Sequence, residues 1–199
     1  MQVALIDAGG ANLGSVRYAL ERLGVQAQLV QRGEDLLSAD RVILPGVSTA
    51  ATVMARLHEL DLVQPLRELR APLLGVCVGM QLLFEHSEED DTPCLGLLPG
   101  RVRKLPESAG VRVPHMGWNQ LQPRASSPLL RGIEAGDHAY FVHSYAAPVT
   151  AACVASTEHG SEFAAVVQQG AIGGAHFHPE RSAAVGARLL QNFIETGLA

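Results

Sequence analysis

At residues 73–84 the sequence reads Leu73-Leu74-Gly75-Val76-Cys77-Val78-Gly79-Met80-Gln81-Leu82-Leu83-Phe84. The apolar residues around the first glycine predict a buried strand, and residues 82–84 predict a helix after the second. Between them, Gly-x-Cys-x-Gly is typical of a nucleophile elbow with cysteine in place of serine. Gly75 and Gly79 leave room for a tight turn beneath Cys77, and the helix start favours its thiolate. The stretch fits a buried, unreactive cysteine equally well, so a catalytic interpretation needs a base elsewhere in the chain.

Length and composition narrow the class of protein. The 199 residues, 47% of them hydrophobic, predict a single domain over residues 1–199 with a sizeable core. A net charge of -5 without a run of lysine or arginine argues against nucleic acid or an anionic membrane as the main partner. Three cysteines without compact spacing fit a reducing compartment. Residues 1–7 do not resemble a signal peptide, and no apolar run is long enough to span a membrane, so we expect a cytoplasmic protein.

Strands and helices alternate through the first half of the chain. Predicted strands cover residues 3–6, 25–30, 41–44 and 73–76, with predicted helices at 13–23, 53–60 and 62–69. This order predicts an α/β fold with a mostly parallel central sheet flanked by helices, and right-handed crossovers between its strands. Short strands between residues 95 and 167 predict a mixed or antiparallel extension of that sheet, before a last strand at 171–178 and a closing helix. The acidic loop 87–93 is interpreted as solvated surface.

A candidate base lies in the segment His176-Phe177-His178-Pro179-Glu180. In an extended segment, side chains two residues apart face the same side at a spacing of roughly 6.5–7 Å, which a glutamate can bridge. We therefore expect His178 to act as base and Glu180 to orient it. His176 shares the face and is a rival base. Two alternatives remain: a metal half-site of both histidines and Glu180, or histidines with a structural role.

Attack of a thiolate on a carbonyl carbon requires donors for the oxyanion that forms. The N–H of Val78 is one expected donor, because it follows the nucleophile in the elbow. The loop Pro45-Gly46-Val47 follows a neighbouring predicted strand, and Val47 is the expected second donor. Ligands of parallel sheets bind at the carboxyl ends of the strands, where both segments fall.

Four segments resemble the class I (triad) glutamine amidotransferases. Residues 76–84 resemble the nucleophile motif of that family, and residues 140–145 and 177–182 fit the member of the family described next. Val113-Pro114-His115-Met116-Gly117-Trp118-Asn119 resembles a segment particular to one member, which acts in histidine biosynthesis. The resemblance runs nearly from end to end of the chain.

This resemblance implies a reaction and a set of residues. Cys77 attacks the side-chain amide of glutamine to give a γ-glutamyl thioester, His178 moves the proton, Glu180 orients His178, and water releases glutamate. The reaction implies no cofactor and no metal. By the same resemblance the glutamine pocket consists of Gly46, Gln81, His143, Ser144 and Tyr145. Ammonia would pass to a (β/α)₈-barrel cyclase in a heterodimer. The residues implied in that interface are Asn12, Trp118, Asn119 and Arg181.

Three positions depart from the family pattern. Ala8-Gly9-Gly10-Ala11-Asn12 stands where Tyr-Gly-x-Gly-Asn is usual, Ser48 stands where the oxyanion loop usually has glycine, and His176 stands where glutamine is commoner. If His176 titrates near neutrality, we expect an extra limb in the pH–activity profile. The alternative functions are another glutaminase of the same fold, such as that of pyridoxal phosphate synthesis, a partner-independent cysteine hydrolase, and a non-catalytic flavodoxin-like binding module.

Overall fold

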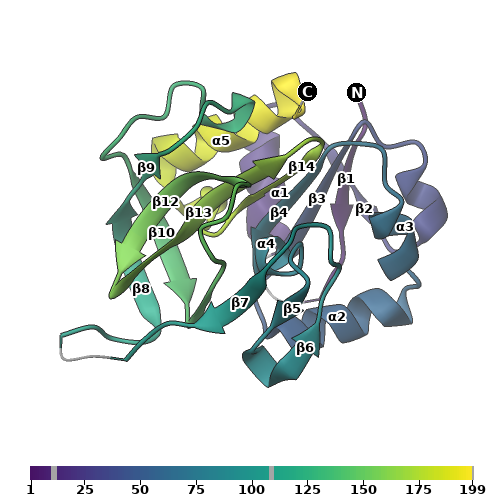
Figure 1. The fold of residues 1–199 in the computed structure, drawn as a ribbon. Coiled ribbons are helices and arrows are strands. Elements are labelled where there is room, and N and C mark those ends of the chain that lie inside the picture. The colour runs from purple at the N-terminus through teal and green to yellow at the C-terminus, as the bar shows by residue number, and fades with distance from the viewer. Residues whose placement is uncertain (10–12, 108–109, 199) are drawn as a thin grey trace.

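The computed structural model describes residues 1–9, 13–107 and 110–198, with an eight-stranded sheet at its centre (Figure 1). The sheet consists of β1 (Val3–Ile6), β2 (Ala27–Val30), β3 (Arg41–Gly46), β4 (Leu73–Cys77), β9 (Gln122–Pro123), β12 (Cys153–His159), β13 (Ser161–Gln169) and β14 (Ile172–Ala175). The strand order is β2-β1-β3-β4-β14-β13-β12-β9. The pairs from β2 to β14 are parallel, and the pairs from β14 to β9 are antiparallel. The predicted α/β fold is confirmed.

Two smaller sheets lie beside the main one. One pairs β8 (His115–Gln120) with β10 (His138–His143), and the other holds β5 (His86–Ser87), β6 (Thr92–Pro93), β7 (Arg101–Lys104) and β11 (Tyr145–Ala146). The expectation that the strands between residues 95 and 167 all extend the main sheet was therefore wrong in part. Side chains of β8 alternate between the interior and the surface. Such alternation belongs to a layer with one face on the core and the other in solvent.

Five α-helices accompany the strands in the described part of the chain: α1 (Leu13–Arg22), α2 (Ala50–Glu59), α3 (Val63–Arg67), α4 (Val78–Gln81) and α5 (Ala183–Thr196). Thr49 caps α2 by accepting the Thr52 N–H at 3.2 Å. Figure 1 shows α5 beside the antiparallel strands and α3 on the side of the parallel strand β2. Within the described ranges, no helix is both long and apolar enough to cross a membrane.

Helix α4 is shorter than the sequence predicts. It ends at Gln81, and Leu82, Leu83 and Phe84 continue as buried turns. The carbonyl groups of these three residues accept backbone hydrogen bonds from residues 95–98, at 2.8–2.9 Å. A longer helix would need those carbonyls for its own hydrogen bonds, so the returning segment ends it.

The turn from β4 into α4 depends on small residues at both flanks. A Cβ atom on Gly79 would lie 1.8 Å from the carbonyl oxygen of Leu44, and one on Gly75 would lie 2.5 Å from the carbonyl oxygen of Gly79. Between them, Cys77 has φ 54° and ψ −115°, a conformation that side-chain-bearing residues rarely adopt. The predicted role of the two glycines is confirmed.

Replacing Gly79 with alanine is expected to lower the free energy of unfolding by about 3 kcal/mol, because β3 and α4 must separate to admit the methyl group. The change is measured by urea unfolding. Gly14→Ala in α1 is the matched control, because among the described residues outside its own helix backbone the nearest atom to a Cβ there is Cε2 of Tyr18, at 4.0 Å. We expect Gly14→Ala to be neutral or slightly stabilising. Equal unfolding midpoints for the two variants would contradict the prediction.

Candidate active site

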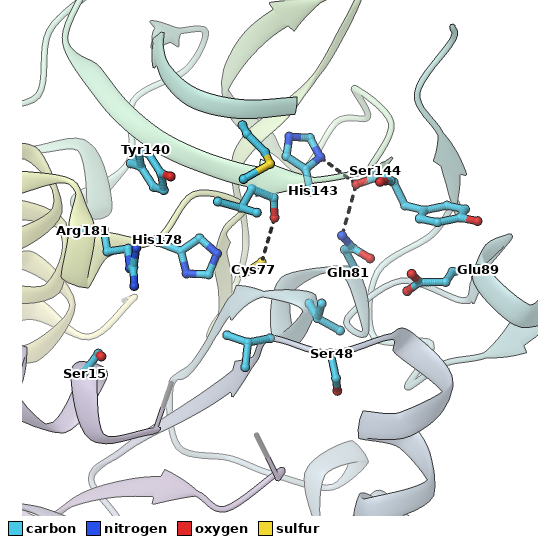
Figure 2. A pocket seen from close by; sticks show the side chains of 15 residues that line it. Ser15, Ser48, Cys77, Gln81, Glu89, Tyr140, His143, Ser144, His178 and Arg181 are labelled. Carbon is cyan, nitrogen blue, oxygen red and sulfur yellow. Dashed lines mark hydrogen bonds between the residues drawn. The ribbon is translucent and has the colours of Figure 1, made fainter. Parts of the chain in front are cut away.

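A pocket of about 570 Å³ lies at the carboxyl ends of the central parallel strands (Figure 2). Gly46 ends β3 directly beside Cys77 at the end of β4. β14 pairs with the other side of β4 and ends at Ala175, shortly before His178. Three adjacent strands therefore direct their following residues to the same edge of the sheet, where ligands of such folds bind.

Cys77 lies at the base of this pocket. Its side chain is buried, with 3% of the residue exposed, and Sγ lies 4.0 Å from the carbonyl oxygen of Val142. Figure 2 shows the imidazole of His178 turned toward Cys77. Cys77 is one of the groups that raise the pKa of His178, so the two side chains interact. The elbow cysteine and the predicted base thus meet, although 100 residues separate them in the sequence.

His178 is also bonded to Glu180. Its Nδ1 lies 2.9 Å from Oε1 of Glu180, and both side chains are buried. Burial lowers the pKa of His178, but its hydrogen bonds to Cys77 and Glu180 and the charges of both groups outweigh this and raise it to about 10. His178 therefore holds a proton at neutral pH. The predicted pairing is confirmed, whereas the extended backbone expected for it was wrong: Pro179–Arg181 is a turn of 3-10 helix.

Ser182 ties the His178 segment to β10. Its Oγ donates to the carbonyl oxygen of His178 at 2.7 Å and accepts the N–H of Tyr140 at 2.9 Å. The His178 N–H in turn donates to the carbonyl oxygen of Tyr140 at 2.9 Å. The imidazole is therefore held from its backbone as well as by Glu180.

His176 is not a rival base. It is fully buried, it does not line the pocket, and its Nε2 lies 3.0 Å from Nε2 of Gln81. Burial lowers the pKa of His176 to about 3. The metal half-site finds no support either, because His176 and His178 have different partners. In the described residues, no group of three or more potential metal ligands is placed to hold an ion.

The premise of an extra pH limb from His176 was consequently wrong, because its pKa of about 3 keeps the imidazole neutral through the working range. We expect His176→Gln to leave the shape of the profile of kcat/KM unchanged between about pH 5.5 and 9. Glutamine keeps an acceptor for the side-chain amide of Gln81. A limb near neutrality that disappears in His176→Gln would restore the rejected premise.

Most of the predicted pocket residues surround Cys77. The wall includes Val47, Val78, Gln81 and residues 143–145. Gly46 is buried behind it, where a Cβ would lie 3.0 Å from Cβ of Val78. Ser48 also lines the pocket, and its φ lies outside the left-handed region, so this conformation does not require glycine there. The described residues thus bring the predicted pocket together.

Glu89 is a pocket residue that sequence reasoning missed. The acidic loop was interpreted as solvated surface, yet Glu89 turns inward while Glu88 and Asp90 stay exposed. Its carboxylate accepts the N–H of Ala50 at 2.8 Å. The pKa of Glu89 is raised, chiefly by burial and further by the neighbouring Asp90, although the hydrogen bond from Ala50 lowers it. Figure 2 places Glu89 on the same side of the pocket as Gln81.

The residues implied in a partner interface lie in different settings. Trp118 is 54% exposed and its ring stands edge-on to Tyr140, with centroids 5.9 Å apart. Arg181 is exposed and lines the pocket. Asn119 faces inward and donates to the carbonyl oxygen of Glu158 at 2.8 Å. Asn12 lies outside the described residues. The interface role of all four stays a prediction.

Comparison with known proteins gives end-to-end matches. A family model described as glutamine amidotransferase class-I matches residues 4–196. The imidazole glycerol phosphate synthase subunit HisH of Xylella fastidiosa strain Temecula1 is 62% identical over 198 residues, covering 100% of this chain and 99% of that protein. The subunit of the same name from Xanthomonas axonopodis pv. citri is 64% identical over 193 residues, covering 97% and 96%.

Solved structures with this fold have more distant sequences. A crystal structure of a glutamine amidotransferase superposes with a TM-score of 0.76 at 23% identity, over 98% of both chains. The structure of PurLQS from Thermotoga maritima gives 0.71 at 19% identity, over 97% of both chains. At such identities the likeness concerns the fold alone.

Proposed function

The chain belongs to the glutamine amidotransferase class-I family, and we propose that it is the glutaminase subunit of an imidazole glycerol phosphate synthase. The observation that carries the glutaminase chemistry is the placement of Cys77 and His178 together in the pocket, with Glu180 bonded to His178 at 2.9 Å. The relatives named HisH, 62% and 64% identical from end to end, support the particular synthase.

The proposed reaction proceeds through a thioester. The thiolate of Cys77 attacks the side-chain carbonyl carbon of glutamine, and negative charge develops on the oxygen. The N–H groups of Val47 and Val78 are the proposed donors for that charge, since both residues line the pocket beside Cys77. When the C–N bond breaks, the proton on His178 goes to the departing amine, which leaves as ammonia.

The second half of the reaction returns the enzyme to its starting state. His178, now neutral, takes a proton from a water molecule that attacks the thioester carbonyl carbon. The C–S bond breaks, and glutamate leaves with the thiolate of Cys77 restored. Glu180 stays ionised and keeps the imidazole oriented through the 2.9 Å bond to Nδ1.

The far side of the pocket suits the amino-acid end of glutamine. Glu89 offers a carboxylate for the α-ammonium group, and Gln81 lies on the same side (Figure 2). Ser144 and Tyr145 line the pocket and can offer backbone groups to the α-carboxylate. Glutamine would then extend across the pocket with its amide at Cys77.

We propose a (β/α)₈-barrel cyclase as the partner subunit. Met116 and Trp118, 63% and 54% exposed, give β8 an apolar outer face close to Arg181 and the pocket mouth. Such a face is typical of a protein interface. The ammonia would pass to the cyclase without meeting bulk water. There it would join the opening of a phosphoribulosyl-formimino nucleotide, giving imidazole glycerol phosphate and an aminoimidazole carboxamide ribotide. The cytoplasmic location stays a prediction.

The test is glutamate release from glutamine by this protein alone and together with a (β/α)₈ cyclase and its nucleotide. We expect low release by the free protein and a strong increase with the complete complex. Strong release that is indifferent to the cyclase would retain the glutaminase chemistry and reject the synthase. It would favour a partner-independent hydrolase or another glutaminase of the family.

A further inference from the structure

A buried chain of hydrogen bonds connects β8 with the pocket. Nδ1 of His115 lies 3.0 Å from Nε2 of His143, and Nδ1 of His143 lies 2.8 Å from the carbonyl oxygen of Tyr145. The same carbonyl oxygen accepts Nε2 of Gln81 at 3.1 Å, and Gln81 Nε2 also lies 3.0 Å from Nε2 of His176. Figure 2 shows His143 and Gln81 meeting at this oxygen.

The Tyr145 carbonyl can only accept hydrogen bonds, and this determines which atom donates and which accepts in each bond of the series. Nδ1 of His143 must therefore carry a proton, which leaves its Nε2 as an acceptor in the neutral ring. Nδ1 of His115 must then donate to it, and Nε2 of His115 becomes an acceptor. Asn119 Nδ2 lies 3.4 Å from that nitrogen and supplies the donor. Each histidine is thus held in its Nδ1–H tautomer.

The surroundings of the two rings oppose a second proton. His115 stacks on Phe141 at 5.1 Å and on His159 at 4.1 Å between ring centroids. Burial, followed by the nearby His159, lowers the pKa of His115 to about 4. Burial and the neighbouring imidazoles also lower the pKa of His143, although its bond to Tyr145 acts the other way. Both rings stay neutral, so the donor and acceptor order of the chain persists across the working pH range.

This series of hydrogen bonds allows the side-chain amide of Gln81 only one orientation. Its NH₂ group is used by the Tyr145 carbonyl and by His176, so the amide oxygen must point away from both. That oxygen is buried and has no hydrogen-bond partner among the described residues. Figure 2 shows it turned toward the side of the pocket where Glu89 lies. A buried acceptor without a donor is unfavourable, and a donor on a ligand would satisfy it.

We propose that His143 and His115 are positioning residues that hold the Gln81 side-chain oxygen as an acceptor for the α-ammonium group of glutamine. The inference rests on the proposed glutaminase function. His143 acts through the Tyr145 carbonyl, because its Nδ1–H holds that carbonyl in the position where it accepts from Gln81. His115 acts one step further away, because its proton fixes the tautomer of His143. Neither ring contacts the reacting carbonyl group.

The test compares His143→Leu, which removes the donor, with His143→Asn, whose Nδ2 can replace Nδ1 of the imidazole. Hydrolysis is measured in the cyclase complex with glutamine and with glutaramate, which lacks the α-amino group. For His143→Leu we expect kcat/KM for glutamine to fall roughly 10–100-fold, mostly through KM, while that for glutaramate changes less than about threefold. His143→Asn should recover most of the loss. Equal losses on both substrates, or no loss, would overturn the inference.

Two further readouts separate the possible failures. If the wild-type complex shows no Cys77-dependent glutamate release, the proposed function itself falls, and the inference with it. If the leucine variant does not fold, ¹⁵N NMR of the wild-type imidazoles decides. We expect Nδ1–H tautomers for His115 and His143 that persist from about pH 5.5 to 9. An Nε2–H tautomer at His143 would overturn the inference in an otherwise active enzyme.

Discussion

Alanine in place of Cys77 is expected to reduce glutamate release by roughly 10⁴-fold or more, because no other group can form the thioester. The carbonyl carbon of glutamine would still lie beside His178. Without the thiolate, however, water must attack the amide directly, and only a slow residual hydrolysis remains. The rate is measured with the cyclase and nucleotide present, so that the active form is tested.

The other two cysteines provide matched controls. Cys94 and Cys153 are buried, and burial raises the pKa of each thiol to about 11, despite a backbone hydrogen bond that lowers it. Cys94→Ala and Cys153→Ala should retain activity. A glutamine-mimicking electrophile should label the wild-type protein at Cys77 alone. Activity that survives in Cys77→Ala and vanishes in a control variant would reject the assigned nucleophile.

Glutamine in place of Glu180 is expected to lower kcat/KM roughly 10²- to 10⁴-fold at neutral pH. The carboxylate fixes the Nδ1–H form of His178 and helps to raise the pKa of His178 to about 10. Because this carboxylate favours the protonated form, its removal lowers that pKa. The imidazole then loses its proton at lower pH, and less of the acid that protonates the departing ammonia remains.

The alkaline limb of the pH–rate profile reports this change. In the wild-type enzyme the limb is expected close to pH 10, the pKa of His178, and in Glu180→Gln it should move to lower pH. The control is Glu107→Gln, since the Glu107 carboxylate is exposed and bonds only to Lys104 in the described structure. An unchanged limb in Glu180→Gln would show that Glu180 does not set the protonation of His178.

Local patterns in the sequence were sufficient for the elbow and for the His178–Glu180 pair. The glycine requirement near Cys77 comes from residues adjacent in the chain, and His178 and Glu180 are close under any compact backbone between them. This is why the pair was predicted correctly although the backbone is a 3-10 turn rather than a strand. The mostly parallel central sheet was predicted in the same way, from the alternation of apolar strand and helix segments.

Other features depend on contacts between distant segments. Helix α4 ends early because the backbone N–H groups of residues 95–98 bond to the carbonyl groups of residues 82–84. Nothing in the sequence of residues 78–84 indicates this contact. Glu89 lies among other acidic residues, so the sequence does not indicate which carboxylate turns inward. Its contact with the N–H of Ala50, at the start of α2, is visible only in the structure. The buried hydrogen-bond network joins three histidines that lie in or just after three different strands: His115, His143 and His176. Single histidines far apart in a sequence do not indicate that they share such a network.

The left-handed backbone at Cys77, with φ 54°, is a conformation that glycine accepts more readily than any other residue. Alanine is ordinarily the more stable of the two small residues, by roughly 0.5–1 kcal/mol in regular structure. Here that order should reverse, since strain of the order of 1–3 kcal/mol is relieved when the side chain is absent. Of two equally inactive proteins, Cys77→Gly should melt above Cys77→Ala. The strain at this turn is therefore relieved only by removing the side chain that performs the reaction, so stability and catalysis make opposite demands on position 77.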